Sequence, residues 1–280
     1  MIVVFKPFQA KSFKDCLILF FMAAYDIVGN IALLKFKRNV LESEKKRIAK
    51  RFLRDNKSVS SILEKIDKFS GRLRTQKSKW LAGNKTKEVL YRENGCVFRF
   101  NVDTCYFSPR LSSERKEIAS FVKKSESVLV MFGGVAPYAI IIAKLSRAGR
   151  VVSVELGRDC NKYAKENVKR NKLGEKVEIV QGDVRRVLGK KGKIKGKFDR
   201  IIMARPNLRD SFLDVAFSLI KKKGVIHYYG FYTEDEKDKM LEMIREESKK
   251  TGRKIKVFRV KKAGEIGTRK FRYRVDFIVQ

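Results

Sequence analysis

Three positions in the C-terminal half place glycines or carboxylates at the ends of apolar runs. The first is the turn Phe132-Gly133-Gly134-Val135-Ala136-Pro137, whose glycines let the backbone approach a ligand closely. The second is Glu155, whose carboxylate can accept both hydroxyl protons of a ribose, and the third is Asp183, which can meet an adenine amino group. Because the glycine turn has no Lys or Arg to hold a phosphate, the three together favour S-adenosylmethionine over NAD or ATP. Either acid alone is equally well explained as an ordinary strand-end residue.

The elements that must position these residues alternate along the chain. Continuous apolar runs predict buried strands at 127–132, 151–155, 177–180 and 198–203. Helical patterns fall between them at 138–147 and 160–171, so the order predicts a parallel sheet with helices on both faces. In such a sheet the ligand lies beyond the carboxyl ends of the strands, near the point where strand order reverses. A helix at 112–124 comes before these elements. A strand at 224–232, a charged helix at 234–249 and strands at 254–261 and 270–279 follow them, as in a methyltransferase sheet with one late strand inserted antiparallel.

The N-terminal half has a different pattern. It predicts an interrupted strand, an amphipathic helix, a short element and a hairpin with an Asn94-Gly95 type I′ turn, at 25–36, 41–55, 59–66 and 87–100. The apolar run 16–24 is too short to span a bilayer and is expected to be a buried helix or strand. We therefore expect an N-terminal apolar extension (1–24), a small α+β module (25–110) and a cofactor-binding α/β domain (111–280).

Charge and composition indicate the class of partner. The 280 residues include 66 Lys and Arg against 31 Asp and Glu, a formal net charge of +35, yet 44% are hydrophobic, which is enough for a folded core. Such an excess indicates a polyanion, nucleic acid first and an anionic membrane second. The lysines of 189–197 add to it, although such a run is also typical of a solvated loop. Four scattered Cys and one His argue against a zinc site or a disulfide scaffold and favour a reducing, cytoplasmic compartment.

Five strings of the sequence occur in the order found in one family. They are Tyr106-Phe-Ser-Pro-Arg-Leu-Ser-Ser-Glu-Arg115, Met131-Phe-Gly-Gly-Val-Ala-Pro-Tyr138, Gly182-Asp-Val-Arg185, Phe198-Asp-Arg-Ile-Ile-Met203 and Gly224-Val-Ile-His-Tyr-Tyr229. From about Tyr25 onward the chain resembles the archaeal and eukaryal tRNA (guanine-37-N1)-methyltransferase family. The resemblance implies a Rossmann-like class I methyltransferase domain with a mixed, mostly parallel seven-stranded sheet. It also implies S-adenosylmethionine as methyl donor, bound by the methyltransferase domain 111–280. The implied partner is the anticodon stem-loop region of tRNA, with 25–110 as a small α+β tRNA-binding (RNA-binding) module, and the implied acceptor is N1 of a flipped guanosine.

The resemblance also implies roles for individual residues. Glu114 matches the general base, which is needed because N1 of guanine holds a proton at neutral pH. Arg74 matches an arginine that stabilises negative charge on the guanine oxygen, and Tyr106 an aromatic that holds the flipped base. The remaining contacts implied are Arg110, Pro206 and Asn207 for the substrate, and Phe132, Gly133, Gly134, Pro137, Glu155 and Asp183 for the cofactor. From the residues alone, Glu114 is also explained as a solvent-facing acid at a helix start, where the helix dipole favours a carboxylate, and Arg74 as one more phosphate contact.

Two positions depart from the family pattern. The chain has Ala204-Arg-Pro-Asn207 where an Asn-Leu-Pro string is usual, which removes one Asn contact that Asn207 would have to replace. It also has Ala136 where glycine is usual, which is expected to leave a methyl group close to the cofactor.

These departures keep two alternatives open: a wybutosine-pathway transferase that moves the aminocarboxypropyl group of the same cofactor, and a non-catalytic tRNA-binding paralogue. We further expect a monomer without a metal, without a membrane partner and without the elbow-binding domain that many family members have.

Overall fold

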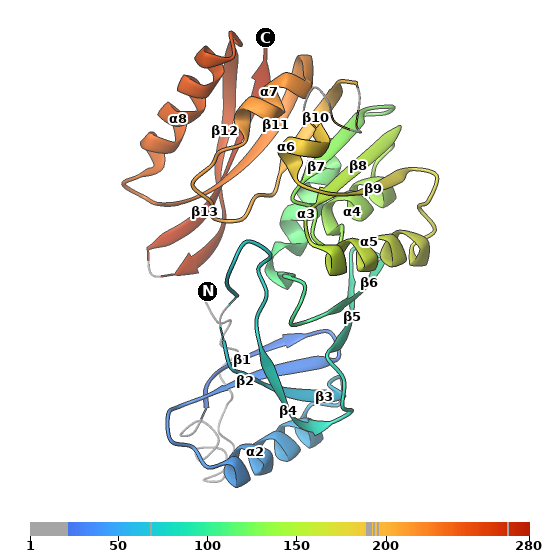
Figure 1. Cartoon of the computed structure of the whole chain (residues 1–280), viewed down its shortest axis with the longest axis vertical. Coiled ribbons are helices and arrows are strands. Elements are labelled where there is room, and N and C mark those ends of the chain that lie inside the picture. Colours follow the sequence, from blue (N-terminus) through green and yellow to red (C-terminus); the bar gives the residue numbers. More distant parts are fainter. Residues whose placement is uncertain (1–21, 68, 189–191, 193, 195, 268) are drawn as a thin grey trace. The chain divides into compact units, whose positions relative to one another are not determined.

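A computed structural model describes residues 22–67, 69–188, 192, 194, 196–267 and 269–280 (Figure 1). These residues form two compact units that divide between Phe107 and Ser108, and each unit is described by itself. The predictions for the apolar run 16–24 and for the lysine-rich segment 189–197 fall mostly outside the described residues.

The N-terminal unit has a four-stranded sheet with the order β1-β2-β3-β4. Its strands are β1 (Met22–Val28), β2 (Ile31–Phe36), β3 (Ser61–Lys65) and β4 (Ser78–Gly83). Neighbours are antiparallel except β2 and β3, which are parallel. Two consecutive parallel strands need a crossover connection, and helix α2 (Glu42–Asp55) connects β2 to β3.

Helix α2 buries one face against this sheet. Ile48, Ala49 and Phe52 recur at helical spacing and are its buried residues. They pack in one cluster with Leu34 of β2 and Ile62 of β3. The amphipathic helix predicted from the sequence is confirmed.

The prediction of a single interrupted strand over 25–36 is wrong. Gly29 and Asn30 form a turn, so β1 and β2 are the two arms of an antiparallel hairpin. Gly29 has a φ of 58°, which disfavours other residues. The Asn30 side chain accepts a hydrogen bond from the Leu90 amide at 2.7 Å, and this bond ties the turn to the next hairpin.

That second hairpin joins β5 (Glu88–Glu93) to β6 (Cys96–Asn101). Asn94 and Gly95 have φ values of 48° and 73°, as a type I′ turn requires, so the predicted hairpin is confirmed.

Alanine at Gly29 is expected to destabilise the N-terminal unit more than alanine at Gly95. Both glycines have positive φ, which costs an L-residue about 1–2 kcal/mol. A Cβ at Gly29 would also lie 2.1 Å from the backbone oxygen of Leu90, whereas one at Gly95 meets nothing within 4 Å. Urea unfolding should show a free energy of unfolding about 1–3 kcal/mol lower for Gly29→Ala than for Gly95→Ala, the usual cost of overpacking. Equal losses would contradict the close packing of this turn on β5.

The C-terminal unit has a seven-stranded sheet with the order β12-β13-β11-β10-β7-β8-β9. Its strands are β7 (Ser127–Met131), β8 (Arg150–Glu155), β9 (Val177–Gln181), β10 (Phe198–Met203), β11 (Ile220–Thr233), β12 (Ile255–Gly267) and β13 (Lys270–Val279). All neighbours are parallel except β13, which is antiparallel to both β11 and β12. The predicted mixed sheet with one late antiparallel strand is confirmed.

Helices cover both faces of this sheet (Figure 1). In chain order they are η1 (Pro109–Leu111), α3 (Ser112–Ser120), α4 (Pro137–Leu145), α5 (Arg158–Arg170), α6 (Val184–Leu188), α7 (Leu213–Leu219) and α8 (Lys237–Lys250). Tyr228 of β11 belongs to the core cluster with Phe217 of α7 and Met240 of α8, whereas Tyr229 contacts Glu114 of α3. Because successive strand residues point to opposite faces, α3 lies on the face away from α7 and α8.

Two α-helices among the described residues were not predicted. Helix α6 has only five residues, and α7 is buried at Leu213, Val215, Ala216, Phe217 and Leu219, so it lacks an amphipathic pattern. The helix predicted over 112–124 ends earlier, at Ser120.

Candidate functional site

The glycine turn after β7 packs closely on β8. The Gly133 amide donates to the Val154 carbonyl at 2.9 Å, and a Cβ on Gly133 would lie 2.0 Å from Oγ of Ser153. The turn requires left-handed backbone, with φ of 63° at Phe132, 56° at Gly134 and 64° at Ala136. The side chain of Ala136 is fully buried, so its methyl group faces protein atoms rather than open space. Pro137 then begins α4, a position that its fixed φ suits.

Glu155 holds this turn and the next one together. Its Oε2 accepts a hydrogen bond from the Gly134 amide at 2.9 Å, and its Oε1 accepts one from the Gly157 amide at 2.8 Å. The residue is half-buried. Each carboxylate oxygen has a second lone pair, so the carboxylate retains the capacity to accept two ribose hydroxyls.

Asp183 lies at the end of the neighbouring strand β9. Its Oδ1 accepts a hydrogen bond from the Arg185 amide at 2.8 Å, at the start of α6. The preceding residue, Gly182, donates its amide to the Glu155 carbonyl at 2.8 Å. The glycine turn, Glu155 and Asp183 therefore gather at the carboxyl ends of β7, β8 and β9, beside the switch in strand order.

The loop after β10 is organised by Arg205 rather than by Asn207. Arg205 is 4% exposed, and its Nη2 donates to the carbonyls of Leu208 and Asp210, the latter at 2.7 Å. Its guanidinium lies 5.5 Å from the ring centroid of Tyr228. Asn207 is exposed and Pro206 is half-buried.

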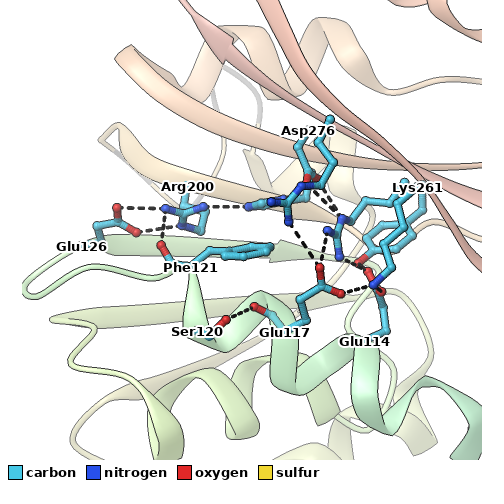
Figure 2. Close-up of polar contacts among 12 residues, drawn as sticks. Glu114, Glu117, Ser120, Phe121, Glu126, Arg200, Lys261 and Asp276 are labelled. Atoms are coloured by element: carbon cyan, nitrogen blue, oxygen red, sulfur yellow. Dashed lines mark hydrogen bonds and ion pairs between the residues drawn. The ribbon is translucent and has the colours of Figure 1, made fainter.

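Glu114 lies in the first turn of α3 and is 5% exposed. Its Oε1 accepts a hydrogen bond from the Tyr229 hydroxyl at 2.7 Å and another from Nη1 of Arg274, while Oε2 lies 3.5 Å from Nζ of Lys261 (Figure 2). Burial, together with nearby Tyr138 and Glu114, raises the pKa of Tyr229 well above its usual value. Tyr229 therefore keeps its proton at physiological pH and is a hydrogen-bond donor to Glu114.

Glu117, one turn further along α3, shares these cations. Its Oε1 accepts from Nη2 of Arg274 at 3.1 Å, and its Oε2 pairs with Nζ of Lys261. Burial alone would raise the pKa of Glu117, but the hydrogen bonds from Arg274 and Lys261 outweigh it and lower that pKa to about 2.

His227 of β11 continues this cluster on the α3 face of the sheet. Its Nδ1 lies 2.7 Å from Oδ1 of Asp276, its Nε2 lies 2.7 Å from Nη1 of Arg200, and its ring stacks near Phe121. Burial lowers the pKa of His227 below 6.5, as do the charges of Arg200 and Arg274, while Asp276 opposes the shift.

We expect His227 to make the stability of the C-terminal unit depend on pH. A lowered folded-state pKa means that below pH 6.5 the unfolded chain binds a proton that the native state does not, so stability falls as the pH falls. The slope should reach at most about 1.4 kcal/mol per pH unit. His227 is the single histidine of the chain, so urea unfolding between about pH 5.5 and 7 should isolate it. A His227→Gln variant that retained the full slope would contradict this assignment.

Arg74 and Tyr106 contact each other in the N-terminal unit. Arg74 lies in a turn between the bridged residues Ser70 and Thr75, with a φ of 54°. Its guanidinium lies 5.2 Å from the ring centroid of Tyr106, and Phe69 packs edge-on against that ring at 5.0 Å.

The remaining predicted residues lie in the C-terminal unit. Arg110 is exposed in η1, near the start of α3. The structure thus brings Arg74 to Tyr106 and the glycine turn to Glu155, while Glu114 belongs to a separate cluster on α3.

Sequence reasoning missed the residues that hold Glu114. Arg274 and Asp276 are fully buried and lie on one face of β13, and Lys261 comes from β12. The available signal was three charges at alternate positions, Arg272, Arg274 and Asp276, within the otherwise apolar or aromatic segment Phe271-Arg-Tyr-Arg-Val-Asp-Phe-Ile-Val279. Charged residues inside a central strand are rarely buried unless they are paired.

Two further observations concern the described residues alone. Within them, no three or more His, Cys, Asp and Glu side chains are grouped so as to hold a metal ion. No helix among them has both the length and the apolar character needed to cross a bilayer.

Comparison with known proteins identifies the family. Residues 89–258 match the TRM5/TYW2 methyltransferase domain, and residues 13–86 match the TYW2 N-terminal domain. The chain belongs to the TRM5/TYW2 methyltransferase family. The resemblance inferred from the sequence strings is thereby confirmed.

Relatives within the TRM5/TYW2 family are named for different transfer reactions on tRNA. The tRNA (guanine(37)-N(1))-methyltransferase Trm5b of Pyrococcus abyssi is 35% identical over 261 residues, which are 93% of this chain and 76% of the relative. The tRNA(Phe) (4-demethylwyosine(37)-C(7)) aminocarboxypropyltransferase of Methanocaldococcus jannaschii is 30% identical over 239 residues, 85% and 90% of the two chains. The crystal structure of Pyrococcus abyssi Trm5b superposes with a TM-score of 0.80 at 34% identity, covering 92% of this chain and 75% of that one. The family thus includes tRNA methyl transferases and tRNA aminocarboxypropyl transferases.

Proposed function

We propose that the protein transfers a methyl group from S-adenosylmethionine to N1 of guanosine 37 in tRNA. The observation that carries the proposal is Glu114, a buried carboxylate held by two donors through Oε1. Guanine N1 holds a proton at neutral pH, so methylation there needs a base that removes it as the methyl group arrives.

The residues at the carboxyl ends of β7, β8 and β9 fit this cofactor. Glu155 has two lone pairs for ribose hydroxyls, Asp183 can accept from the adenine amino group, and the glycine turn presents no cation for a phosphate. Phe132, Gly133, Gly134 and Pro137 would form the wall of the site. When bound, the cofactor supplies an electrophilic methyl group on a sulfonium.

Three residues would act on the guanosine. Glu114 would take the N1 proton, Arg74 would stabilise the negative charge that grows on the guanine oxygen, and Tyr106 would hold the flipped base. Arg110, Pro206 and Asn207 would contact the nucleotide around it. The net charge of +35 supports binding to the anticodon stem-loop region through phosphates.

Methyl transfer can be tested directly. Purified protein is incubated with labelled S-adenosylmethionine and an unmodified tRNA transcript, with a transcript carrying adenosine at position 37 as the control. Label in the first transcript alone, recovered as 1-methylguanosine by mass spectrometry of nucleosides, is the expected result. No transfer to any tRNA would refute the proposal.

One observation favours a second candidate, aminocarboxypropyl transfer to the tricyclic base at position 37. Residues 13–86 match the TYW2 N-terminal domain, and the aminocarboxypropyltransferase relative spans 85% of this chain. The absence of the usual Asn at Ala204 points the same way. With tRNA that carries 4-demethylwyosine, the mass of the product nucleoside separates the two activities, because the two transferred groups differ greatly in mass.

A non-catalytic tRNA-binding role is supported less well. The sequence features that allow this role are Ala204 and Ala136. The methyl group of Ala136 is fully buried among protein atoms, so it does not extend into open space at the glycine turn. Calorimetry with S-adenosylmethionine decides the matter, because this role requires tight tRNA binding without cofactor binding.

A further inference from the structure

A continuous chain of polar contacts crosses the α3 face of the sheet and ends at Glu114 (Figure 2). Its outer end is Glu126, which accepts from Nε of Arg200 at 2.8 Å. Arg200 contacts His227, His227 contacts Asp276, and Asp276 accepts from Nε of Arg274 at 3.1 Å. Nη1 of Arg274 then donates to Oε1 of Glu114. The described C-terminal unit thus links β10, β11, β13 and α3 through side chains alone.

The chemistry of arginine fixes the proton on His227. A guanidinium can only donate, so Nε2 of His227 must accept from Nη1 of Arg200. The remaining proton of a neutral ring then lies on Nδ1 and is donated to Asp276. The lowered pKa of His227 agrees with a neutral ring.

The charges of the cluster balance only when His227 is neutral. Four carboxylates face four cations, namely Glu114, Glu117, Glu126 and Asp276 against Arg200, Arg259, Lys261 and Arg274. A proton added to His227 would therefore leave one uncompensated positive charge in a buried site.

Three side chains, Tyr229, Lys261 and Arg274, contact Glu114 and are called its anchor, and Arg274 lies at the centre of the anchor. The side chain is fully buried, and its single guanidinium contacts the carboxylates of Asp276, Glu114 and Glu117. Lysine, a point charge on a flexible stem, cannot span three carboxylates in this way. The orientation of Glu114 therefore depends on the planar fork of Arg274.

The two carboxylate oxygens of Glu114 have different contacts in the anchor. Oε1 takes two donors, the Tyr229 hydroxyl and Nη1 of Arg274. Oε2 makes an ion pair with Nζ of Lys261 at 3.5 Å, a distance beyond a strong hydrogen bond. Lys261 is 41% exposed, so Oε2 is the oxygen next to a partly solvent-exposed side chain.

We propose that Arg274 and Tyr229 are positioning residues that hold Oε1 of Glu114, so that Oε2 is presented to the substrate proton, and that neutral His227 in its Nδ1–H form fixes Arg274 through Asp276. The inference rests on the proposed function, since it assigns the geometry of the base in that reaction. A base must lie within hydrogen-bond reach of its proton, and a shift of about 1 Å in a reacting group can cost 100-fold in rate.

The first experiment measures single-turnover methyl transfer at saturating tRNA and S-adenosylmethionine. Tyr229→Phe removes the hydroxyl donor and Arg274→Lys the planar fork, and each should lower the rate constant about 10- to 100-fold. The dissociation constants of tRNA and cofactor should stay within about twofold of the wild-type values. The midpoint of unfolding of Tyr229→Phe should stay close to that of the wild-type protein, because the ring is retained.

Matched controls make this result specific. Tyr273→Phe also removes a buried tyrosine hydroxyl, for which the described residues supply no hydrogen-bond partner. Tyr273 lies on the face of β13 opposite to Arg274, in the core cluster with α7 and α8. Arg259→Lys keeps the charge of an arginine that pairs with Glu117 and, at 4.0 Å, with Asp276, rather than with Glu114. Both controls should keep rates within about twofold of the wild-type protein. A Tyr229→Phe rate that matches Tyr273→Phe would overturn the proposal.

The second experiment needs no activity. Because the chain has one histidine, nitrogen-15 NMR of histidine-labelled protein reports His227 alone. The expected spectrum at pH 7 is that of the Nδ1–H tautomer, and Arg274→Lys should shift its Nδ1 signal more than Arg259→Lys does. An Nε2–H tautomer or an imidazolium would overturn the link through Asp276. Wild-type protein that shows the Nδ1–H spectrum but transfers no methyl group would refute the proposed function, a result distinct from a loss confined to the variants.

Discussion

Replacing Glu114 with Gln is expected to lower the single-turnover rate of methyl transfer by about 10²- to 10⁴-fold, the usual contribution of a positioned general base. The amide oxygen of Gln can still accept from Tyr229 and Arg274, so the side chain should keep its place. The amide nitrogen, however, stands where Oε2 was and cannot take the N1 proton. Rapid-quench assays with labelled cofactor measure this rate, and tRNA affinity should change little.

Glu117→Gln is the matched control for that variant. Glu117 lies on the same helix and shares Arg274 and Lys261 with Glu114, so the substitution makes the same chemical change in the same cluster. We expect a loss of no more than about tenfold, because Glu117 supports the anchor without taking the proton. Equal losses in the two variants, or full activity of Glu114→Gln, would remove the assignment of Glu114 as the base.

The affinity for tRNA is expected to fall steeply with salt. A chain with a net charge of +35 should neutralise many phosphates, and a protein with 6–10 phosphate contacts loses about 10³- to 10⁵-fold in affinity between 50 and 200 mM salt. Filter binding or fluorescence anisotropy over this range gives the slope of log Kd against log salt. A shallow slope would mean that the charge serves another purpose.

Arg74→Ala separates two roles within the same experiment. If Arg74 acts on the guanine oxygen, the variant should keep the salt slope and lose rate by about 10²- to 10³-fold. If Arg74 is one more phosphate contact, the slope should fall by about one and the rate at saturation should be retained. Arg72→Ala, on the same turn, is the control for general loss of charge.

The predicted elements succeeded where a local pattern decides structure. The run Val128-Leu-Val-Met131 is apolar because both faces of the parallel sheet are buried at β7, and Asn94-Gly95 allows the φ values that its hairpin needs. The turn at Gly29 was missed because its strands β1 and β2 are apolar on both sides of it, which reads as one interrupted strand. Helix α7 was missed because burial on most sides leaves no amphipathic pattern.

Contacts within the candidate site could be predicted from the sequence pattern only where the residues follow strands along the chain. Glu155 and the glycine turn lie beside each other because consecutive parallel strands end at one edge of the sheet. The contact between Glu114 and Arg274 joins positions 160 residues apart, and no local spacing indicates it. Only the strand order, with β13 between β11 and β12, brings Arg274 under α3.

That strand order also sets when Glu114, the proposed base, gains its partners during synthesis. Strand β13 follows β12 in the chain but lies inside the sheet, so the gap between β11 and β12 stays open until β13 has been made. The glycine turn and Glu155 come from β7 and β8, which emerge from the ribosome far earlier. We therefore expect a nascent chain ending before β13 to leave Glu114 without its arginine. The residues expected to bind the cofactor would be in place first, and the proposed base, Glu114, would gain Arg274 last.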